Sequence, residues 1–410
     1  MARRLARPRS TFVAAALLSS LAIGACAMRE RGQVPQSAWI AGWMAAPSWR
    51  PQNPRENEMV AFSNQSVRQD VRIGFAADHV RLRLSNELGD EAVEVGNIRL
   101  ARIGPGDTLE SPVVARFAGQ ERATLRPGQV LTSDSIALKL PAFADLAISV
   151  YYPGAARPVA HRLMVRVASG ADMPGSALPQ TRGPAIVSAV EFAADPVAAP
   201  AVVVAFGDSI TEGAGSHTPN TDWPSLLAQR LQRSCPGGFV VLNAGIGGNQ
   251  LLGDGGSPGA LSRLDRDVLS FAGVSNVILL EGINDIRRAD DSDSAGTAED
   301  LVAGYRQIIG RLHARGIKVI GATLTPYEGT ARQTPRGLAT VARVNELIRD
   351  GNLFDGVIDF YPALEDPARP GRMRPELSSG DWLHPGERGY AAMAGAIPTS
   401  LFGPCKSAPR

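Results

Sequence analysis

The sequence VVVAFGDSITEGAG (residues 202–215) runs from an apolar segment directly into small, polar and acidic residues. The consecutive apolar residues at its start are typical of a buried strand. Gly207, Asp208 and Ser209 then mark the point at which the chain leaves the strand and a helix begins. Ser209 has two interpretations at this point. It is the helix N-cap, which is the commoner role for a serine there, or it is a nucleophile.

The pattern after residue 200 alternates apolar runs with helical periodicity, which predicts parallel strand–helix–strand units in a layered α/β sheet. The strands are predicted over residues 201–206, 239–243, 275–281, 317–323 and 356–360. Apolar residues at a spacing of three and four predict a helix over residues 298–316, with Thr297 and Asp300 as a capping pair at its start. The loops that follow such strands meet at the carboxyl edge of the sheet, where open α/β sheets bind their ligands.

The N-terminal half has a different pattern. Residues 36–192 contain short segments with alternating polar and apolar residues, separated by Gly, Pro and Asp, and this pattern predicts an all-β sandwich. The Ala- and Pro-rich segment 193–200 predicts a linker. The α/β domain then covers residues 201–405.

Residues 1–25 have the pattern of a secretory signal peptide, with four arginines followed by an apolar run. The segment IGAC (residues 23–26) resembles a bacterial lipobox, so we expect a cell-envelope lipoprotein with a lipid on Cys26, or a soluble secreted or periplasmic form. Without residues 1–25 the chain has 38 basic residues (42 minus 4) and 40 acidic ones, which gives no support for nucleic-acid binding. Cys235 and Cys405 remain, either as a disulfide or as two buried thiols.

A serine nucleophile needs a base with a pKa near neutrality and a carboxylate that orients the base. The segment DWLH offers both, because Asp381 and His384 are three residues apart and a single turn of chain can bring their side chains together. His217 is the rival base, since it is close to Ser209 in the sequence. Its one carboxylate at an orienting spacing is that of Asp222, and Pro219 lies between them. Ser209 does not lie in a G-x-S-x-G elbow, because Thr211 occupies the last position of that motif.

Acyl transfer also needs hydrogen-bond donors at the position of the developing oxyanion. The glycine-rich segment GIGGN (residues 245–249) can bring a backbone N–H close to a ligand. Asn284, in the segment GIND, offers a side-chain amide. Each has a plainer interpretation as well, which is a turn for the glycines and a strand-end cap for Asn284.

Together these segments resemble the four sequence blocks of the SGNH (GDSL-type) hydrolase family, with GDSITEG as the first block, NAGIGG as the second, GIND as the third and DWLH as the last. The resemblance covers about residues 201–402. Other segments, such as GWMAAPSW and VRLRLSNELGDE, are similar to secreted bacterial members with an added N-terminal β-domain. The resemblance implies a flavodoxin-like α/β/α hydrolase domain with a parallel sheet, preceded by a jelly-roll-like β-sandwich.

The resemblance also implies roles for the residues of the four blocks. Ser209, Asp381 and His384 are the expected catalytic triad. The N–H groups of Ser209 and Gly248 and the side chain of Asn284 are the expected oxyanion hole. Two other glycines of the second block are alternatives to Gly248.

We therefore expect a serine ester hydrolase that works through an acyl-enzyme and needs no cofactor or metal. The expected substrate is a short acyl ester, such as an acetyl group on a glycan, with Leu251 and Leu252 as candidate acyl contacts. A lysophospholipase or acyltransferase with the same triad is one alternative, and a non-catalytic envelope-binding protein is another. The β-domain either binds such glycans or only covers the α/β domain.

Overall fold

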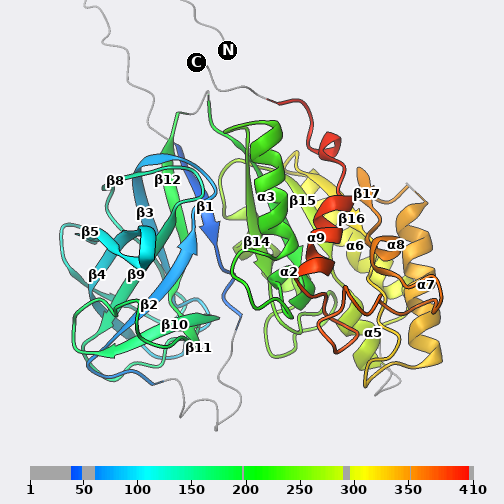
Figure 1. Ribbon diagram of the computed structural model, residues 1–410, viewed down its shortest axis with the longest axis horizontal. Coiled ribbons are helices and arrows are strands. Elements are labelled where there is room, and N and C mark those ends of the chain that lie inside the picture. The colour runs from blue at the N-terminus through cyan, green and yellow to red at the C-terminus, as the bar shows by residue number, and fades with distance from the viewer. Residues whose placement is uncertain (1–37, 49–60, 196–197, 290–295, 351, 406–410) are drawn as a thin grey trace, which may run out of the picture. The chain divides into compact units, whose positions relative to one another are not determined.

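The computed structural model describes residues 38–48, 61–195, 198–289, 296–350 and 352–405 (Figure 1). The predicted signal peptide and Cys26 lie outside the described residues. The described residues belong to one compact unit, Ser37–Arg410. None of the helices in these ranges is both long and apolar enough to cross a membrane.

The N-terminal half is built from two antiparallel sheets, and the predicted β-sandwich is confirmed. Its strands are β1 (Ala38–Met44), β2 (Gln65–Arg72), β3 (Ala77–Ser85), β4 (Val93–Ile103), β5 (Leu109–Val114), β6 (Arg122–Leu125), β7 (Val130–Thr132), β8 (Ile136–Leu140), β9 (Asp145–Tyr152), β10 (His161–Ser169), β11 (Thr181–Ala185) and β12 (Val187–Ala194), with the short 3-10 helix η1 (Pro105–Asp107) after β4. One sheet has the order β1-β12-β3-β7, with β8 also paired to β3, and the other has the order β11-β10-β2-β9-β4-β5, with β6 also paired to β4. Alternate residues of β3, namely Val80, Leu82 and Leu84, are fully buried, as a strand with one core face requires.

The second half contains one parallel sheet with the strand order β14-β13-β15-β16-β17. The strands are β13 (Ala201–Gly207), β14 (Phe239–Gly245), β15 (Val274–Leu280), β16 (Lys318–Ala322) and β17 (Gly356–Ile358). Counted along the chain this order is 2-1-3-4-5, which confirms the predicted flavodoxin-like arrangement. The last strand is shorter than predicted, because a helix begins at Phe360.

Helices pack against this sheet in two groups. They are α2 (Ser209–Glu212), α3 (Trp223–Ser234), α4 (Ala260–Leu264), the π-helical turn η2 (Asp265–Leu269), α5 (Ile283–Ala289), α6 (Ala298–His313), α7 (Pro335–Arg349), α8 (Phe360–Leu364), α9 (Glu387–Ala396) and the 3-10 helix η3 (Thr399–Phe402). In one group α9 contacts α3 and α8, and in the other α6 contacts α4 and α7 while α5 contacts α7. Thr297 and Asp300 form the predicted capping box of α6.

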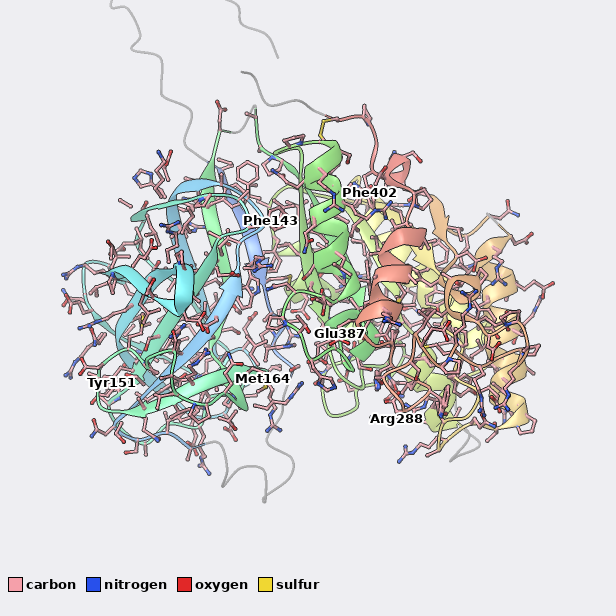
Figure 2. The ribbon with its side chains drawn as sticks, in the orientation of Figure 1. Phe143, Tyr151, Met164, Arg288, Glu387 and Phe402 are labelled. Atoms are coloured by element: carbon pink, nitrogen blue, oxygen red, sulfur yellow. A yellow bond between two sulfur atoms is a disulfide. The ribbon has the colours of Figure 1, made fainter. Side chains whose placement is uncertain are left out.

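Cys235 and Cys405 form a disulfide that ties the end of α3 to the C-terminal segment (Figure 2). The bond closes a loop with a sequence separation of 170 residues. In the chain-entropy account a loop of this length stabilises the folded state by roughly 5 kcal/mol, because it restricts the unfolded chain.

The sandwich and the α/β half share one continuous hydrophobic core. Strand β1 contacts β14, the edge strand of the parallel sheet. Polar contacts add to this packing. Arg266 donates a hydrogen bond to the carbonyl of Pro47 at 2.8 Å, and Arg182 of β11 binds Glu212 at 3.0 Å. Glu212 is the last residue of α2, so the sandwich contacts the helix that begins with Ser209.

Candidate active site

Three loops of the predicted site follow adjacent strands of the parallel sheet. Ser209 follows β13, Gly248 follows β14 and Asn284 follows β15. Strand β13 lies between the other two in the sheet. Because parallel strands end at the same edge, the order of the strands brings these three segments together at the topological switch point.

Asp208, and not Ser209, is the N-cap of α2. The Asp208 Oδ1 atom accepts a hydrogen bond from the N–H of Ile210 at 2.8 Å. Ser209 is the first residue of the helix, so the N-cap interpretation of this serine is wrong. The sequence contained the signal for this, since aspartate is as good a cap as serine. The Ser209 hydroxyl is thereby left for another partner.

The Ser209 hydroxyl lies 2.9 Å from Nε2 of His384, and Nδ1 of the same ring lies 2.5 Å from Oδ2 of Asp381. An ionised carboxylate can only accept hydrogen bonds, so Nδ1 carries the ring proton and Nε2 presents a lone pair. The Ser209 hydroxyl then donates to Nε2. This is the order of groups that raises the nucleophilicity of a serine oxygen.

Asp381 is held in its ionised form by the turn that it begins. Its Oδ1 atom accepts hydrogen bonds from the N–H groups of Leu383 at 2.9 Å and of His384 at 2.8 Å. Burial alone would raise the pKa of Asp381, but the hydrogen bonds from His384 and Leu383 outweigh it and lower the pKa below its usual value. The carboxylate therefore stays charged at neutral pH and can orient the His384 ring.

Trp382, which lies between Asp381 and His384 in the sequence, has a φ of 62°, which is unusual for a bulky side chain. The Arg372 guanidinium lies 4.9 Å from the centre of its indole ring, and Arg372 is ion-paired with Glu328. Such backbone strain persists only where neighbouring contacts enforce it, and it is common at functional sites. Nothing in the sequence indicated the contact between Trp382 and Arg372, because a positive φ at a tryptophan has no local sequence signal.

The side-chain amide of Asn284 offers one free donor. Its Nδ2 atom donates to the backbone carbonyl of Asn249 at 2.9 Å, and its Oδ1 atom lies 3.4 Å from an Arg287 nitrogen. An amide nitrogen has two hydrogens. Since Asn249 takes one of them, the second is available to a ligand.

The structure distinguishes among the three glycines after β14. The N–H of Gly245 donates to the Asn243 side chain at 2.9 Å, and a Cβ at Gly245 would lie 2.1 Å from the backbone nitrogen of Glu212. Gly245 is therefore needed for the close packing of α2 on β14. Gly248 has a φ of 70° and open space around the position of a Cβ. Within the described residues neither the N–H of Gly247 nor that of Gly248 has a hydrogen-bond acceptor.

His217, the rival base, is exposed and has no contact with Ser209 in the part of the chain that the structure describes. Its backbone N–H donates to Glu387 at 3.0 Å, at the start of α9. Leu251 and Leu252, the two candidate acyl contacts, pack against α6. Leu251 is fully buried, and both side chains lie against Gly304 of α6.

Arg263 of α4 joins the ends of β13 and β14. Its side chain is fully buried. It donates to the carbonyls of Gly207 and Ala244 and to the Asn249 side chain, each at 2.8 Å. Asp267 and Glu281 lie 3.1 and 3.4 Å from its guanidinium nitrogens. An arginine in a short helix is usually exposed, so its sequence position gave no sign of this role.

A group of buried acids surrounds the start of α2. Burial, with a smaller contribution from the charge of Asp285, raises the pKa of Asp208 to about 7, although the hydrogen bond from the Ile210 N–H and the charge of Arg263 act in the opposite direction. Burial also raises the pKa of Asp285 and of Glu281. Among the described residues no set of three or more His, Cys, Asp or Glu side chains is arranged to hold a metal ion.

The raised pKa of Asp208 predicts a pH dependence of stability. The folded state binds the Asp208 proton more tightly than the unfolded state, so this contribution is complete below about pH 4 and is lost as the pH rises through about 7. We expect the melting temperature of Asp208→Asn to fall less between pH 5 and pH 8 than that of the wild type. Asparagine keeps the cap acceptor. Parallel melting curves across this range, measured by differential scanning fluorimetry, would contradict the assignment.

Residues 205–392 match the family model described as the GDSL-like Lipase/Acylhydrolase family. A search of curated proteins gave no match. Among solved structures, a lipase/acylhydrolase from Enterococcus faecalis is 25% identical over 50% of this chain and 96% of its own, with a TM-score of 0.39. A carbohydrate acetylesterase family member from Sinorhizobium meliloti is 19% identical over 48% of this chain and 94% of its own, also with a TM-score of 0.39.

Proposed function

Because residues 205–392 belong to the GDSL-like lipase/acylhydrolase family and the chain is therefore a carboxylic ester hydrolase, we propose that it removes short acyl groups, such as acetyl, from hydroxyl groups of glycans. The observation that carries the proposal is the continuous hydrogen-bonded series Ser209, His384 and Asp381. The reaction needs a nucleophile, a base and an orienting carboxylate, and this series contains each.

In the proposed reaction Ser209 Oγ attacks the ester carbonyl while its proton passes to His384 Nε2. The resulting imidazolium is stabilised by the ionised Asp381. The imidazolium then protonates the leaving alkoxide, and the acyl group stays on Ser209. Water next gives a proton to His384 and attacks the acyl-enzyme, which releases the carboxylic acid and restores the serine.

The oxyanion of the tetrahedral intermediate in each step needs hydrogen-bond donors that are already in place. The free N–H of the Asn284 amide, the N–H of Ser209 at the start of α2 and the N–H of Gly248 are the proposed donors. Each such donor lowers the barrier by roughly 2.7 to 4 kcal/mol in enzymes of this kind. The Asn284 donor is pre-oriented, because its other hydrogen is bonded to Asn249.

The surroundings of the series support a small acyl group and a hydrated alcohol. The His384 and Asp381 side chains are 20% and 50% exposed, so the base and its carboxylate lie near the surface and not at the end of an apolar tunnel. The neighbour of Asn284 is the guanidinium of Arg287. A guanidinium at this position can donate hydrogen bonds to the hydroxyl groups of a glycan, which a long acyl chain lacks.

Covalent labelling and a series of esters test this function. A fluorophosphonate that reacts with activated serines is expected to modify Ser209, as located by peptide mass spectrometry. The value of kcat/KM is expected to be highest for p-nitrophenyl acetate and to fall through the butyrate to the octanoate. Labelling of a different serine would contradict the mechanism. A preference for octanoate, or equally fast deacylation of a lysophospholipid, would contradict the proposed substrate class.

A further inference from the structure

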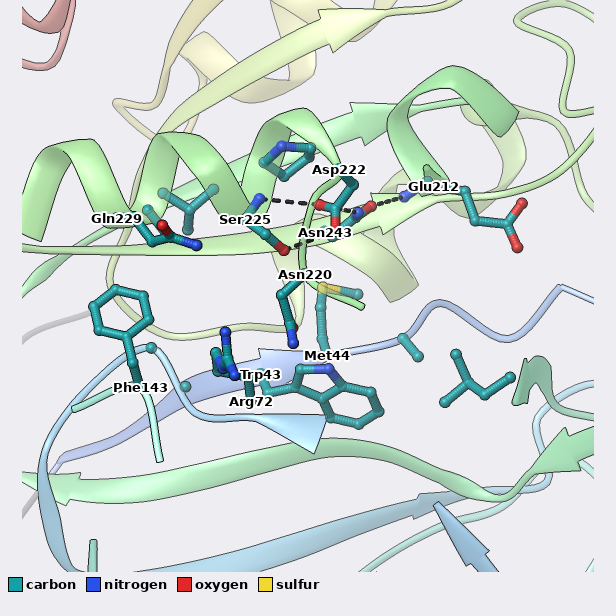
Figure 3. Close-up of a pocket in the computed structure, with 18 of the residues that line it drawn as sticks. Trp43, Met44, Arg72, Phe143, Glu212, Asn220, Asp222, Ser225, Gln229 and Asn243 are labelled. Atoms are coloured by element: carbon teal, nitrogen blue, oxygen red, sulfur yellow. Dashed lines mark hydrogen bonds between the residues drawn. The ribbon is translucent and has the colours of Figure 1, made fainter. Parts of the chain in front are cut away.

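A cavity of about 180 Å³ lies between the sandwich and the α/β half, and none of the three residues of the hydrogen-bonded series lines it (Figure 3). Trp43, Arg72 and Phe143 line it from the sandwich. Asn220 and Gln229 line it from the segment before α3 and from α3 itself. Figure 3 shows Asn220 extending from the α3 side toward the strand that carries Trp43. We propose that this cavity binds one neutral monosaccharide unit.

The charged groups of the cavity already have partners. Arg72 makes two hydrogen bonds of 2.8 Å to Asp145, and Glu212 is paired with Arg182 at 3.0 Å. His161, which also lines the cavity, has its Nδ1 atom 2.7 Å from the Ala46 carbonyl oxygen and its Nε2 atom 3.4 Å from Glu212. Asp222 is used as the N-cap of α3, and burial raises its pKa. No charge is left for an ionic ligand to neutralise, and an ion in this cavity would lose its hydration without gaining a counter-charge. The ligand is therefore uncharged.

The groups that remain available match hydroxyls. The side-chain amides of Asn220 and Gln229 and the indole N–H of Trp43 have no hydrogen-bond partner within the described ranges. Each amide is both a donor and an acceptor, as is each sugar hydroxyl. The rings of Trp43 and Phe143 supply flat apolar surfaces for the C–H face of a pyranose. This combination of aromatic rings and amides suits a sugar and not a purely apolar molecule.

One backbone outlier and one left-handed asparagine lie among the residues that line the cavity. Phe143 has a φ of 61° and Asn220 has a φ of 60°. Asparagine tolerates this region, but for phenylalanine it is a genuine outlier. Strained residues of this kind persist where the surrounding structure enforces them, and they gather at ligand clamps. The two residues lie in different halves of the structure and line the same cavity.

The size of the cavity limits the ligand to one unit. Its 180 Å³ lies below the roughly 300 to 1,000 Å³ of typical small-molecule pockets. This space suits a small ligand such as a single monosaccharide. The inference goes beyond the proposed ester hydrolysis, since binding here requires none of the groups at Ser209.

Titration calorimetry of the full chain with D-xylose, D-galactose and N-acetyl-D-glucosamine tests the site. At least one of these sugars is expected to bind saturably with one site per chain. Asn220→Gly and Gln229→Leu are each expected to weaken that binding by roughly 3- to 10-fold, because each removes an amide partner of a hydroxyl. Glycine at position 220 tolerates the backbone conformation, so this variant is expected to fold.

Asn64→Gly is the matched control, because Asn64 also has a positive φ, 50°, but is exposed in the sandwich and does not line the cavity. Its sugar affinity is expected to equal that of the wild type. Failure of all three sugars to bind, or binding that neither Asn220→Gly nor Gln229→Leu weakens, would overturn the proposal. Binding that persists in Ser209→Ala and is lost in the cavity variants supports it.

Discussion

Ser209→Ala is expected to lower kcat for p-nitrophenyl acetate by about 10⁴-fold or more, with little change in the melting temperature. The loss is large because the variant retains His384 and Asp381 but has no atom that can form the acyl-enzyme. Stability is expected to be almost unchanged, since the cap of α2 is provided by Asp208 and not by the serine hydroxyl. Initial rates at saturating ester and a thermal melt measure the two quantities.

Ser262→Ala is a suitable control, because Ser262 is an exposed residue of α4. It is expected to retain the rate and the melting temperature of the wild type. A Ser209→Ala protein that hydrolyses the ester at the wild-type rate would exclude Ser209 as the nucleophile. Loss of activity together with a large fall in melting temperature would assign the serine a structural role instead.

The architecture and the proximity of three of the four segments could be predicted because both follow from local patterns and one topological rule. Apolar runs located β13 to β16 nearly to the residue. Parallel strands end at a common edge, so the segments that carry Ser209, Gly248 and Asn284 were expected to meet. His384 follows no strand of the sheet, and its meeting with Ser209 was expected from the need for a base and from the resemblance to the SGNH family; the two side chains lie 2.9 Å apart. The contact between Asp381 and His384 could be predicted from their spacing of three residues alone.

The features that the sequence did not predict include one local choice and several contacts between distant elements. The choice of Asp208 as the cap required knowing which of two adjacent good caps faces the helix. Pairing of Cys235 with Cys405 depends on where the C-terminal segment runs. The cavity beside Trp43 exists only because two halves of the chain pack together. Residue type alone indicates none of these contacts.

Arg263→Met is expected to lower the free energy of unfolding by about 3 to 5 kcal/mol. Methionine retains much of the aliphatic packing of the arginine, but every hydrogen bond of the guanidinium is lost. Asp267 and Glu281 would then lie buried without this counter-charge, and breaking a buried ion pair from one side has a cost of this size. Urea unfolding followed by intrinsic fluorescence gives the free energy. Arg343→Met, at an exposed ion pair of α7, is expected to cost less than about 1 kcal/mol.

The same substitution separates a positioning role of Arg263 from a purely structural one. Arg263 binds the Asn249 side chain, and the carbonyl of Asn249 accepts the hydrogen bond that orients the Asn284 amide. At a temperature where the variant is fully folded, kcat is expected to fall by roughly 10- to 100-fold with KM little changed, because a small displacement of an oxyanion donor weakens transition-state binding more than substrate binding.

Arg263→Lys keeps the charge but not the planar fork, so it is expected to recover part of the stability and little of kcat. A variant that loses stability while keeping the wild-type kcat would show that the hydrogen bonds from Arg263 through Asn249 to Asn284 support the fold and leave the donor geometry unaffected.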